Sequence, residues 1–283
     1  MHQTLGGARI LVTGSTGFLG QYVTPALSAA GASVVGVSKS LGFDLRNEAE
    51  VLTAALLAKP NIVVHLAASR ADKPAFAFKD DVLMGLNVVN ASSIAKAKLV
   101  VLCNEYAVED GEKGAASRTL LSALRAYKAQ YSIPYAVLVA QRAYGAGDAL
   151  VSGLARLFLD AAFQDAPGVS LAANKVSGML ALTHAIDIAK AVVSACSTLE
   201  DAEPVTLPGE AISFNDLAKE VAGAAGYKGK VELEGEFKKN GIHKILSGQK
   251  ASTLLSWHPE TPLKEGIAQT VDWCRQVMSG GVQ

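Results

Sequence analysis

A glycine-rich turn between an apolar strand and a helix constrains the fold of this chain most. The segment ARILVTGS predicts a strand closed by glycine, and GFLGQYVTPALSAAG has the apolar spacing of a helix that ends at Gly31. Gly14, Gly17 and Gly20 stand at G-x-x-G-x-x-G spacing in the turn between them. A side chain there would hold a pyrophosphate away from the backbone N–H groups and from the positive end of the helix. The pattern predicts a dinucleotide site; the alternative is a tight turn with no ligand.

The chain continues to alternate strands and helices. Strands are expected at 32–38, 61–69, 98–104 and 135–141, and helices at 47–59, 81–97 and 117–130. Strands alternating with helices of this length predict an α/β fold with a doubly wound parallel sheet. Later elements are less regular, with helices expected at 149–164 and 185–196 and strand-like segments at 169–173 and 178–184, followed by PVTLPG and SFNDLAKEVAGAAG. We therefore expect one unit over 1–283, with a dinucleotide-binding lobe at about 1–150 and a smaller C-terminal, mainly substrate-binding lobe at about 151–283.

Charge and cysteine content argue against several classes of partner. The 26 basic and 26 acidic side chains cancel, so no long-range field would gather nucleic acid or an anionic membrane. The three cysteines are far apart and match no metal-ligand spacing. No signal peptide or membrane-spanning segment is recognisable. We expect a cytoplasmic protein that uses no metal and acts on a small molecule.

The second strand ends in residues that bear on the choice of dinucleotide. A NAD-binding unit usually offers Asp or Glu to the ribose hydroxyls about twenty residues past the last glycine. Here GVSKS supplies Ser38, Lys39 and Ser40, which would suit a 2′-phosphate, so NADP is favoured and NAD stays possible. A solvated loop lysine is the alternative for Lys39. Asp44, in FDLRN, is placed where a carboxylate could meet the adenine amine, or where it could cap a helix or form a turn.

Several segments together resemble one enzyme family. TGSTGFLG, FDLRN, VVHLAAS, AYGAGD, LTHAIDIAKAV and STLLSWHPETPLKEGIAQTVDWCRQ follow one another from about Arg9 to Arg275. In this order they resemble the extended short-chain dehydrogenase/reductases, which include NAD-dependent epimerases and dehydratases and sugar-nucleotide 4-ketoreductases. The resemblance implies NAD(P) binding, a nucleotide-linked substrate under the C-terminal half, and a possible homodimer formed through helices of the first lobe. In that family the segment matching Leu66 to Ser69 lines the cofactor. Together with the glycine turn and the end of the second strand, this gives the expected cofactor-binding residues: Gly14, Thr16, Gly17, Phe18, Leu19, Gly20, Ser38, Lys39, Asp44, Leu45, Leu66, Ala67, Ala68 and Ser69.

The chain departs from that family at the proton donor. Members carry a Tyr-x-x-x-Lys pair one helical turn apart, in which lysine lowers the pKa of the tyrosine. No tyrosine in this sequence has lysine four residues later. Aligning the following strand puts Lys113 or Gly114 at the tyrosine position and Ser117 or Arg118 at the lysine position. An Arg-Pro pair common in the family is replaced by VAQRAYG, with only Arg142 nearby. The arginine that often holds the substrate diphosphate is replaced by apolar residues around Leu180.

Three hypotheses follow for the function. In the first, which we favour, the enzyme transfers hydride to a nucleotide-sugar-like carbonyl substrate or epimerises it, and Tyr106, Glu105 or Lys113 is the proton donor. The substrate would lie between the lobes, near Tyr106, Arg142 and Tyr144. In the second, the protein is a non-redox cyclase, lyase or isomerase of an apolar metabolite. In the third, it is a catalytically inactive regulatory binding protein.

Overall fold

The structure of the chain is a computed structural model, in which two compact units can be described. The described residues are 4–69, 74–108, 114–172, 177–200, 204–235, 238–242 and 245–280. The first unit comprises 1–140, 188–207 and 247–258, and the second comprises 141–187, 208–246 and 259–283. The chain therefore passes between the units several times.

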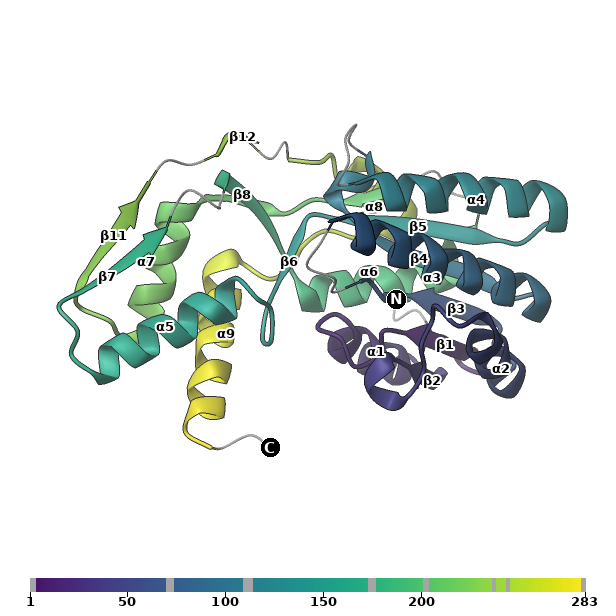
Figure 1. The fold of residues 1–283 in the computed structure, drawn as a ribbon, viewed down its shortest axis with the longest axis horizontal. Helices are drawn as coiled ribbons and strands as arrows, with labels where there is room; N and C mark the ends of the chain where they lie inside the picture. Colours follow the sequence, from purple (N-terminus) through teal and green to yellow (C-terminus); the bar gives the residue numbers. More distant parts are fainter. Residues whose placement is uncertain are drawn as a thin grey trace. The chain divides into compact units, whose positions relative to one another are not determined.

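The first unit is built on a six-stranded parallel sheet (Figure 1). Its order is β2-β1-β3-β4-β5-β9, and every neighbouring pair is parallel. The strands are β1 (Arg9–Thr13), β2 (Ser33–Val37), β3 (Ile62–His65), β4 (Lys98–Asn104), β5 (Tyr135–Ala140) and β9 (Val205–Leu207). The order reverses at β1, so the first connection leaves on one side of β1 and the later ones on the other. This is the doubly wound α/β fold that the sequence predicted.

Helices of the first unit cover this sheet. They are α1 (Gly20–Ala29), α2 (Glu48–Ala58), α3 (Pro74–Ala95), α4 (Ala115–Tyr131), most of α6 (Ala185–Thr198) and α8 (Gln249–Leu255), with short 3₁₀ turns η1 (Lys39–Leu41) and η2 (Glu105–Val108). Helix α3 packs between α2 and α4 (Figure 1). Right-handed crossovers put α1 on the face opposite these three helices, because the step from β1 to β2 runs against the later steps.

Local sequence explains where these elements begin and end. Strand β3 is buried at every position, as expected of a parallel strand covered on both faces. Helix α2 begins after Asn47, whose side chain accepts the Ala49 N–H, and Glu48 and Glu50 lie near its positive end. At the first residue of β4, the buried Lys98 ammonium donates to the carbonyls of Ala195 and Cys196 in the last turns of α6.

The second unit is held by a helical core beside two small sheets. Helices α5 (Val151–Phe163), α7 (Phe214–Ala225) and α9 (Leu263–Met278) pack against one another. Asp148 accepts hydrogen bonds from three N–H groups at the start of α5. One sheet has the order β10-β8-β12 with β6 also paired to β8, and the other pairs β7 with β11. The strands are β6 (Arg142–Tyr144), β7 (Gly168–Ala172), β8 (Ser177–His184), β10 (Glu210–Ser213), β11 (Lys230–Glu234) and β12 (Lys238–Ile242).

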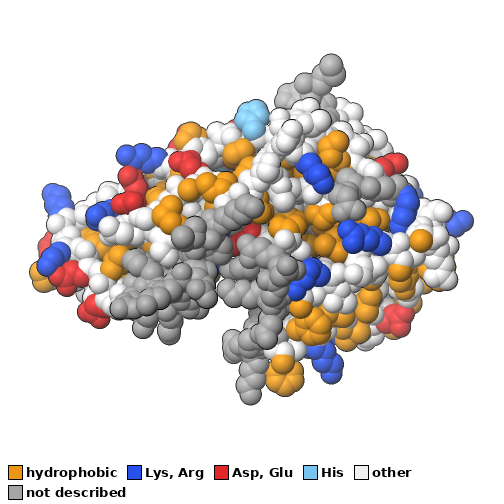
Figure 2. Space-filling view, turned by 90° about the horizontal axis from the view of Figure 1, so that it is seen from above, with side chains coloured by type: hydrophobic (Ala, Val, Ile, Leu, Met, Phe, Trp, Pro, Cys, Tyr) orange, Lys and Arg blue, Asp and Glu red, His pale blue; other side chains and the backbone are white. Residues whose placement is uncertain are grey.

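On the face drawn in Figure 2, basic and acidic side chains form separate small groups among neutral surface. Within the described parts of the chain, no helix combines the length and apolar character needed to cross a bilayer.

Candidate functional site

The glycine turn lies at the carboxyl end of β1, where it is closely packed. Gly14 has a φ of 72°, in the left-handed region, and a Cβ there would lie 2.8 Å from the Ala67 nitrogen. A Cβ on Gly20 would clash with the carbonyl oxygens of Gly14 and Ser15. Gly36 in β2 leaves room for the Ser15 hydroxyl, which a Cβ would approach to 2.6 Å. These positions therefore require glycine for a turn that brings β1, β2 and the start of α1 together.

The same turn offers backbone donors at the start of α1. No side chain caps this helix, and its first turn has no acidic residue. Within the described part of the chain, the N–H groups of Phe18 and Leu19 have no backbone acceptor, and both residues are only half-buried. Unpaired N–H groups at the positive end of a helix favour an anion. The turn therefore fits the diphosphate of a dinucleotide.

The end of β3 contacts the glycine turn and is hydrogen-bonded to the end of β1. The Thr13 carbonyl accepts the Leu66 N–H at 3.2 Å, and Thr13 Oγ1 and His65 Nδ1 are 2.7 Å apart in a buried hydrogen bond. The backbone of the next residues, Leu66 and Ala67, packs directly against Gly14. His65 is thus a core residue, as the sequence suggested, and it fixes the two strand ends that shape the turn.

We expect His65 to make the protein less stable in acid. Burial lowers the pKa of this imidazole from 6.5 to about 4. In the unfolded chain this histidine binds a proton below about pH 6.5, whereas in the folded chain it binds one only below about pH 4. The free energy of unfolding should therefore fall as the pH drops from 6.5 to about 4. The lowered pKa corresponds to a loss of about 3 kcal/mol of stability when the pH has fallen to about 4. Urea unfolding at pH 7 and pH 4.5 measures it.

The matched variants are His65→Gln and His258→Gln, the second of which replaces an exposed histidine. His65→Gln should be less stable at neutral pH but should lose less stability on acidification than the wild type. If His65→Gln kept the full wild-type pH dependence, His65 would not be its source.

Three hydroxyl groups meet beyond the end of β2. Thr16 Oγ1 lies 2.9 Å from Ser38 Oγ and 2.7 Å from Ser40 Oγ, and the two serine oxygens are 3.0 Å apart. Lys39 lies between the serines in sequence, and its side chain is exposed. Hydroxyl groups and a lysine can bind phosphate oxygens, whereas nothing in this cluster carries the negative charge that would repel them. In NAD-binding units an Asp or Glu at the end of the second strand binds the ribose hydroxyls, and this cluster stands at the corresponding strand end.

Asp44 follows η1 and is paired with a cation. Arg46 donates to both of its carboxylate oxygens, the shortest distance being 2.6 Å, and this pairing lowers the pKa of Asp44 to about 2. Its backbone N–H donates to Glu50, and Asn47, not Asp44, caps α2. Asp44 is therefore an ionised turn residue, and contact with an adenine amine stays a prediction. Leu45, the next expected contact, is buried in the core.

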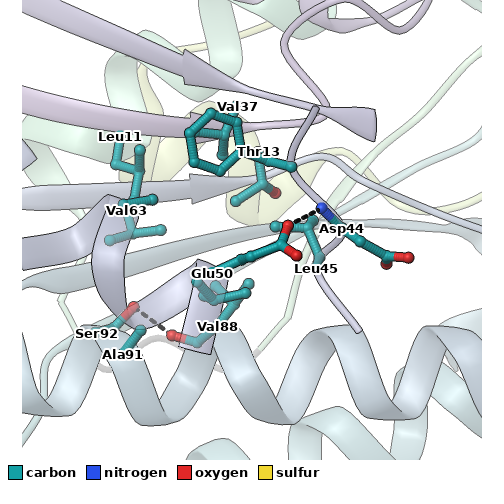
Figure 3. A pocket seen from close by; sticks show the side chains of 13 residues that line it. Leu11, Thr13, Val37, Asp44, Leu45, Glu50, Val63, Val88, Ala91 and Ser92 are labelled. Atoms are coloured by element: carbon teal, nitrogen blue, oxygen red, sulfur yellow. Dashed lines mark hydrogen bonds between the residues drawn. The ribbon is translucent and has the colours of Figure 1, made fainter. Parts of the chain in front are cut away.

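A narrow gap lies between the sheet and α2 and α3 (Figure 3). Thr13, Asp44 and Glu50 contribute to its lining among mostly aliphatic side chains, and in Figure 3 the Glu50 carboxylate is directed to the Asp44 nitrogen. Its volume is about 10 Å³, which is barely enough for one water. The gap is a packing defect and not a ligand pocket.

The segment after β3 forms the other expected wall of the cofactor site. Leu66, Ala67 and Ser69 are half-buried and Ala68 is exposed, directly after the strand. The Ser69 N–H donates to the Asp81 carboxylate of α3 at 2.5 Å. Asp81 could not be expected here from the sequence, because nothing in its local pattern shows that α3 directs its carboxylate to this segment.

The expected catalytic residues follow β4. Glu105 and Tyr106 lie in η2, directly past the strand end, and Glu105 is buried. The structure describes the backbone of Tyr106 but not its side chain, and Lys113 lies outside the described residues. Their roles therefore stay predictions. Strand β4 lies between β3 and β5 in the middle of the sheet. Open α/β sheets bind ligands at the carboxyl ends of such strands.

Ser117, one of the two residues expected at the family's lysine position, lies in the first turn of α4 beside Cys103 of β4. Burial raises the pKa of the Cys103 thiol to about 11, and a hydrogen bond with Ser117 only partly opposes this. At neutral pH Cys103 is therefore a neutral thiol. Cys103, Cys196 and Cys274 are all buried and unpaired by disulfides.

Arg142 and Tyr144 belong to β6 in the second unit. Arg142 is exposed, whereas Tyr144 is 1% exposed and its ring meets His184 edge-on at 5.0 Å. Burial, together with the charge of Glu210, raises the pKa of Tyr144 far above its usual value. Both also lie on the strand next to β8, where Leu180 is buried. Tyr144 thus packs in the core of this unit, and a role for either residue toward substrate stays a prediction.

These features define a doubly wound, dinucleotide-type α/β unit with a glycine turn at its strand ends. Residues 10–110, which span this turn, match the sequence model of the NAD dependent epimerase/dehydratase family. No curated protein matches the sequence.

Solved structures with the same fold cover almost the whole chain. UDP-glucose 4-epimerase of Thermotoga maritima, solved with UDP-glucose, has 21% identity and a TM-score of 0.82 over 95% of this chain and 99% of its own. UDP-glucose 4-epimerase of Thermus thermophilus, solved with NAD, has 23% identity and a TM-score of 0.79 over 94% and 99%. GDP-mannoheptose C4 reductase of Campylobacter jejuni, solved with NADP, has 18% identity and a TM-score of 0.81 over 95% and 98%. At these identities the similarity establishes the fold.

Proposed function

We propose that the protein is an NAD(P)-dependent oxidoreductase or epimerase of a nucleotide-sugar-like carbonyl substrate. The observation that carries this proposal is the glycine turn at the uncapped start of α1, where the Phe18 and Leu19 N–H groups have no backbone acceptor among the described residues. The family match over residues 10–110 supports it, and so do the relatives in fold whose names state epimerase or reductase activity.

Particular residues would hold the cofactor. The Phe18 and Leu19 N–H groups would bind the diphosphate, and the cluster of Thr16, Ser38 and Ser40 would bind the adenosine ribose. Leu66 to Ser69 would line the opposite side. When bound, the nicotinamide would give or accept hydride at the substrate carbonyl carbon.

The proton must then come from the chain itself. We propose that Tyr106, with Glu105 beside it, replaces the absent Tyr-x-x-x-Lys pair, because both residues directly follow a central strand. A buried carboxylate next to a tyrosine can orient it or exchange its proton. Lys113 is the remaining candidate.

NADP is the cofactor that we expect to bind more tightly. Lys39→Glu should weaken NADPH binding by at least about tenfold, because it puts a negative charge beside a ribose phosphate, and should change NADH binding much less. Calorimetric titration of both nucleotides measures the ratio.

Lys250→Glu is the matched control, since Lys250 is an exposed lysine of α8 in the same unit. It should leave both affinities unchanged. An equal loss for NADPH and NADH in Lys39→Glu would mean that Lys39 does not distinguish the two cofactors.

The reaction itself can be tested with a panel of nucleotide sugars. Thermal stabilisation by one of them, followed by a change in absorbance of the reduced nicotinamide during turnover, is the expected result for a reductase. An epimerase would convert the sugar with no net change in absorbance. If no nucleotide sugar stabilises or reacts, the substrate class is wrong.

A second candidate function has an observation of its own. Ser117 or Arg118 is expected at the position of the family's lysine. If it is Ser117, whose hydroxyl bonds to the neutral Cys103 thiol, no cation at this position lowers the pKa of a tyrosine. A non-redox reaction of an apolar metabolite, or a regulatory role, would need no such lysine. Unchanged cofactor oxidation state during turnover of a substrate that is not a sugar would favour the first of these, and cofactor binding without any turnover would favour the second.

A further inference from the structure

A second concave site lies at the amino end of the sheet in the first unit. It is formed where β1 begins, where the α2–β3 turn passes, and where α3 ends, so it lies at the edge opposite the glycine turn. Its volume is about 340 Å³. That is within the range of small-molecule sites, which begin at about 300 Å³. We refer to it as the amino-end groove, defined by Arg9, Leu52, Leu56, Lys59, Ile94 and Lys96.

Three cations border the amino-end groove. Arg9 is held in place because its Nε donates to the Lys59 carbonyl at 2.7 Å and its backbone N–H donates to Asn61. Within the described part of the chain, no carboxylate pairs with Arg9, Lys59 or Lys96, and all three are exposed. The bond from Nε restrains the Arg9 guanidinium, whose other N–H groups can donate to an anion.

The helix ends nearby do not cancel this charge. Helices α2 and α3 both end at the groove, and each C-terminus carries about half a negative charge. Two such ends offset about one of the three positive charges. A net positive charge of about two is left to attract an anion.

The walls between these cations are apolar. Leu56 is 63% exposed and Ile94 is 54% exposed, while Leu52 is half-buried and Ala55 is buried beneath them. Exposed aliphatic side chains lining a concavity gain free energy when an apolar group covers them. The groove thus combines an anion-binding rim with an apolar floor.

We infer that the amino-end groove binds a small amphiphilic anion, a carboxylate or phosphate monoester with a short alkyl tail. The charged group would contact Arg9, Lys59 and Lys96, and the tail would cover Leu56 and Ile94. This site is independent of the proposed function, because the groove shares no residue with the glycine turn or with the hydroxyl cluster.

Calorimetry with octanoate and octyl phosphate tests the inference, with 1-octanol as the uncharged probe. Both anions should bind, and 1-octanol should bind at least about tenfold more weakly, because it lacks the charge. Which anion binds more tightly identifies the headgroup. The Lys59→Gln/Lys96→Gln double variant should weaken binding of both anions by at least about tenfold.

Two further variants separate the contributions. Leu56→Asp replaces an exposed side chain and should abolish binding, because the new carboxylate repels the anion and the apolar contact with its tail is lost. Lys250→Gln should bind both anions like the wild type. NADPH binding should be unchanged in every groove variant, which distinguishes failure of this inference from failure of the proposed function. No octanoate or octyl phosphate binding up to about 10 mM would overturn the inference, since such affinity is below about 3 kcal/mol. Equal binding in the double variant, or binding only to phosphatidylglycerol vesicles, would overturn it as well.

Discussion

Gly20→Ala should abolish tight NADPH binding. The new Cβ would clash with the carbonyl oxygens of Gly14 and Ser15, which are backbone atoms and cannot rotate away. The start of α1 must then shift, and the Phe18 and Leu19 N–H groups shift with it. We expect affinity to fall by at least about 100-fold, which is about 2.7 kcal/mol. The free energy of unfolding should fall by about 1–3 kcal/mol.

Gly223→Ala is the matched control. Gly223 lies within α7, and a Cβ there would meet no atom within 4 Å. This variant should bind NADPH like the wild type and should be equally or more stable, because alanine favours a helix over glycine. Wild-type NADPH affinity in a folded Gly20→Ala protein would contradict the position of the cofactor.

Tyr106→Phe should slow turnover of the identified substrate by about 10²–10⁴-fold, which is the usual contribution of a positioned acid or base. Glu105→Gln should also slow it, because a buried amide cannot exchange the proton of a carboxyl group. NADPH affinity should change little in both variants. Steady-state kcat and kcat/KM, measured beside separate binding titrations, distinguish a chemical role from a structural one.

Tyr131→Phe is the matched control for Tyr106→Phe, since Tyr131 is an exposed tyrosine at the end of α4. It should react at the wild-type rate. If Tyr106→Phe and Glu105→Gln both react at that rate, then neither residue supplies the proton, and Lys113→Gln becomes the next variant to measure.

The fold of the first unit could be predicted closely because its elements are repetitive and locally encoded. The strand expected at 98–104 is β4, and the helix expected at 47–59 is α2 to within a residue at each end. Parallel strands buried on both faces give unbroken apolar runs, and helix caps such as Asn47 mark the boundaries.

Errors occurred where longer-range contacts decide the boundary. The helix expected at 81–97 begins at Pro74, before any apolar periodicity shows, and the strand expected to reach residue 69 ends at His65. Beyond His65 the chain leaves the sheet and packs against Gly14. The end of the strand thus depends on contacts between segments about fifty residues apart in sequence. The short strands β6, β9, β10, β11 and β12 were not predicted, because few residues of each carry a period of two.

The candidate site was predictable only in part for the same reason. The glycine spacing and the hydroxyls of Ser38 and Ser40 can be read from short segments. The pairing of Asp44 with Arg46, the Thr13–His65 hydrogen bond and the position of Asp81 depend on side-chain directions that spacing alone does not supply.

Direct titration of the wild-type protein with NADPH and NADH, followed by nicotinamide fluorescence and calorimetry, tests the central claim most directly. The glycine turn, the Phe18 and Leu19 N–H groups and the hydroxyl cluster predict saturable binding of both nucleotides, with NADPH binding more tightly. Absence of binding of either nucleotide at millimolar concentration would contradict the dinucleotide site and the function proposed from it.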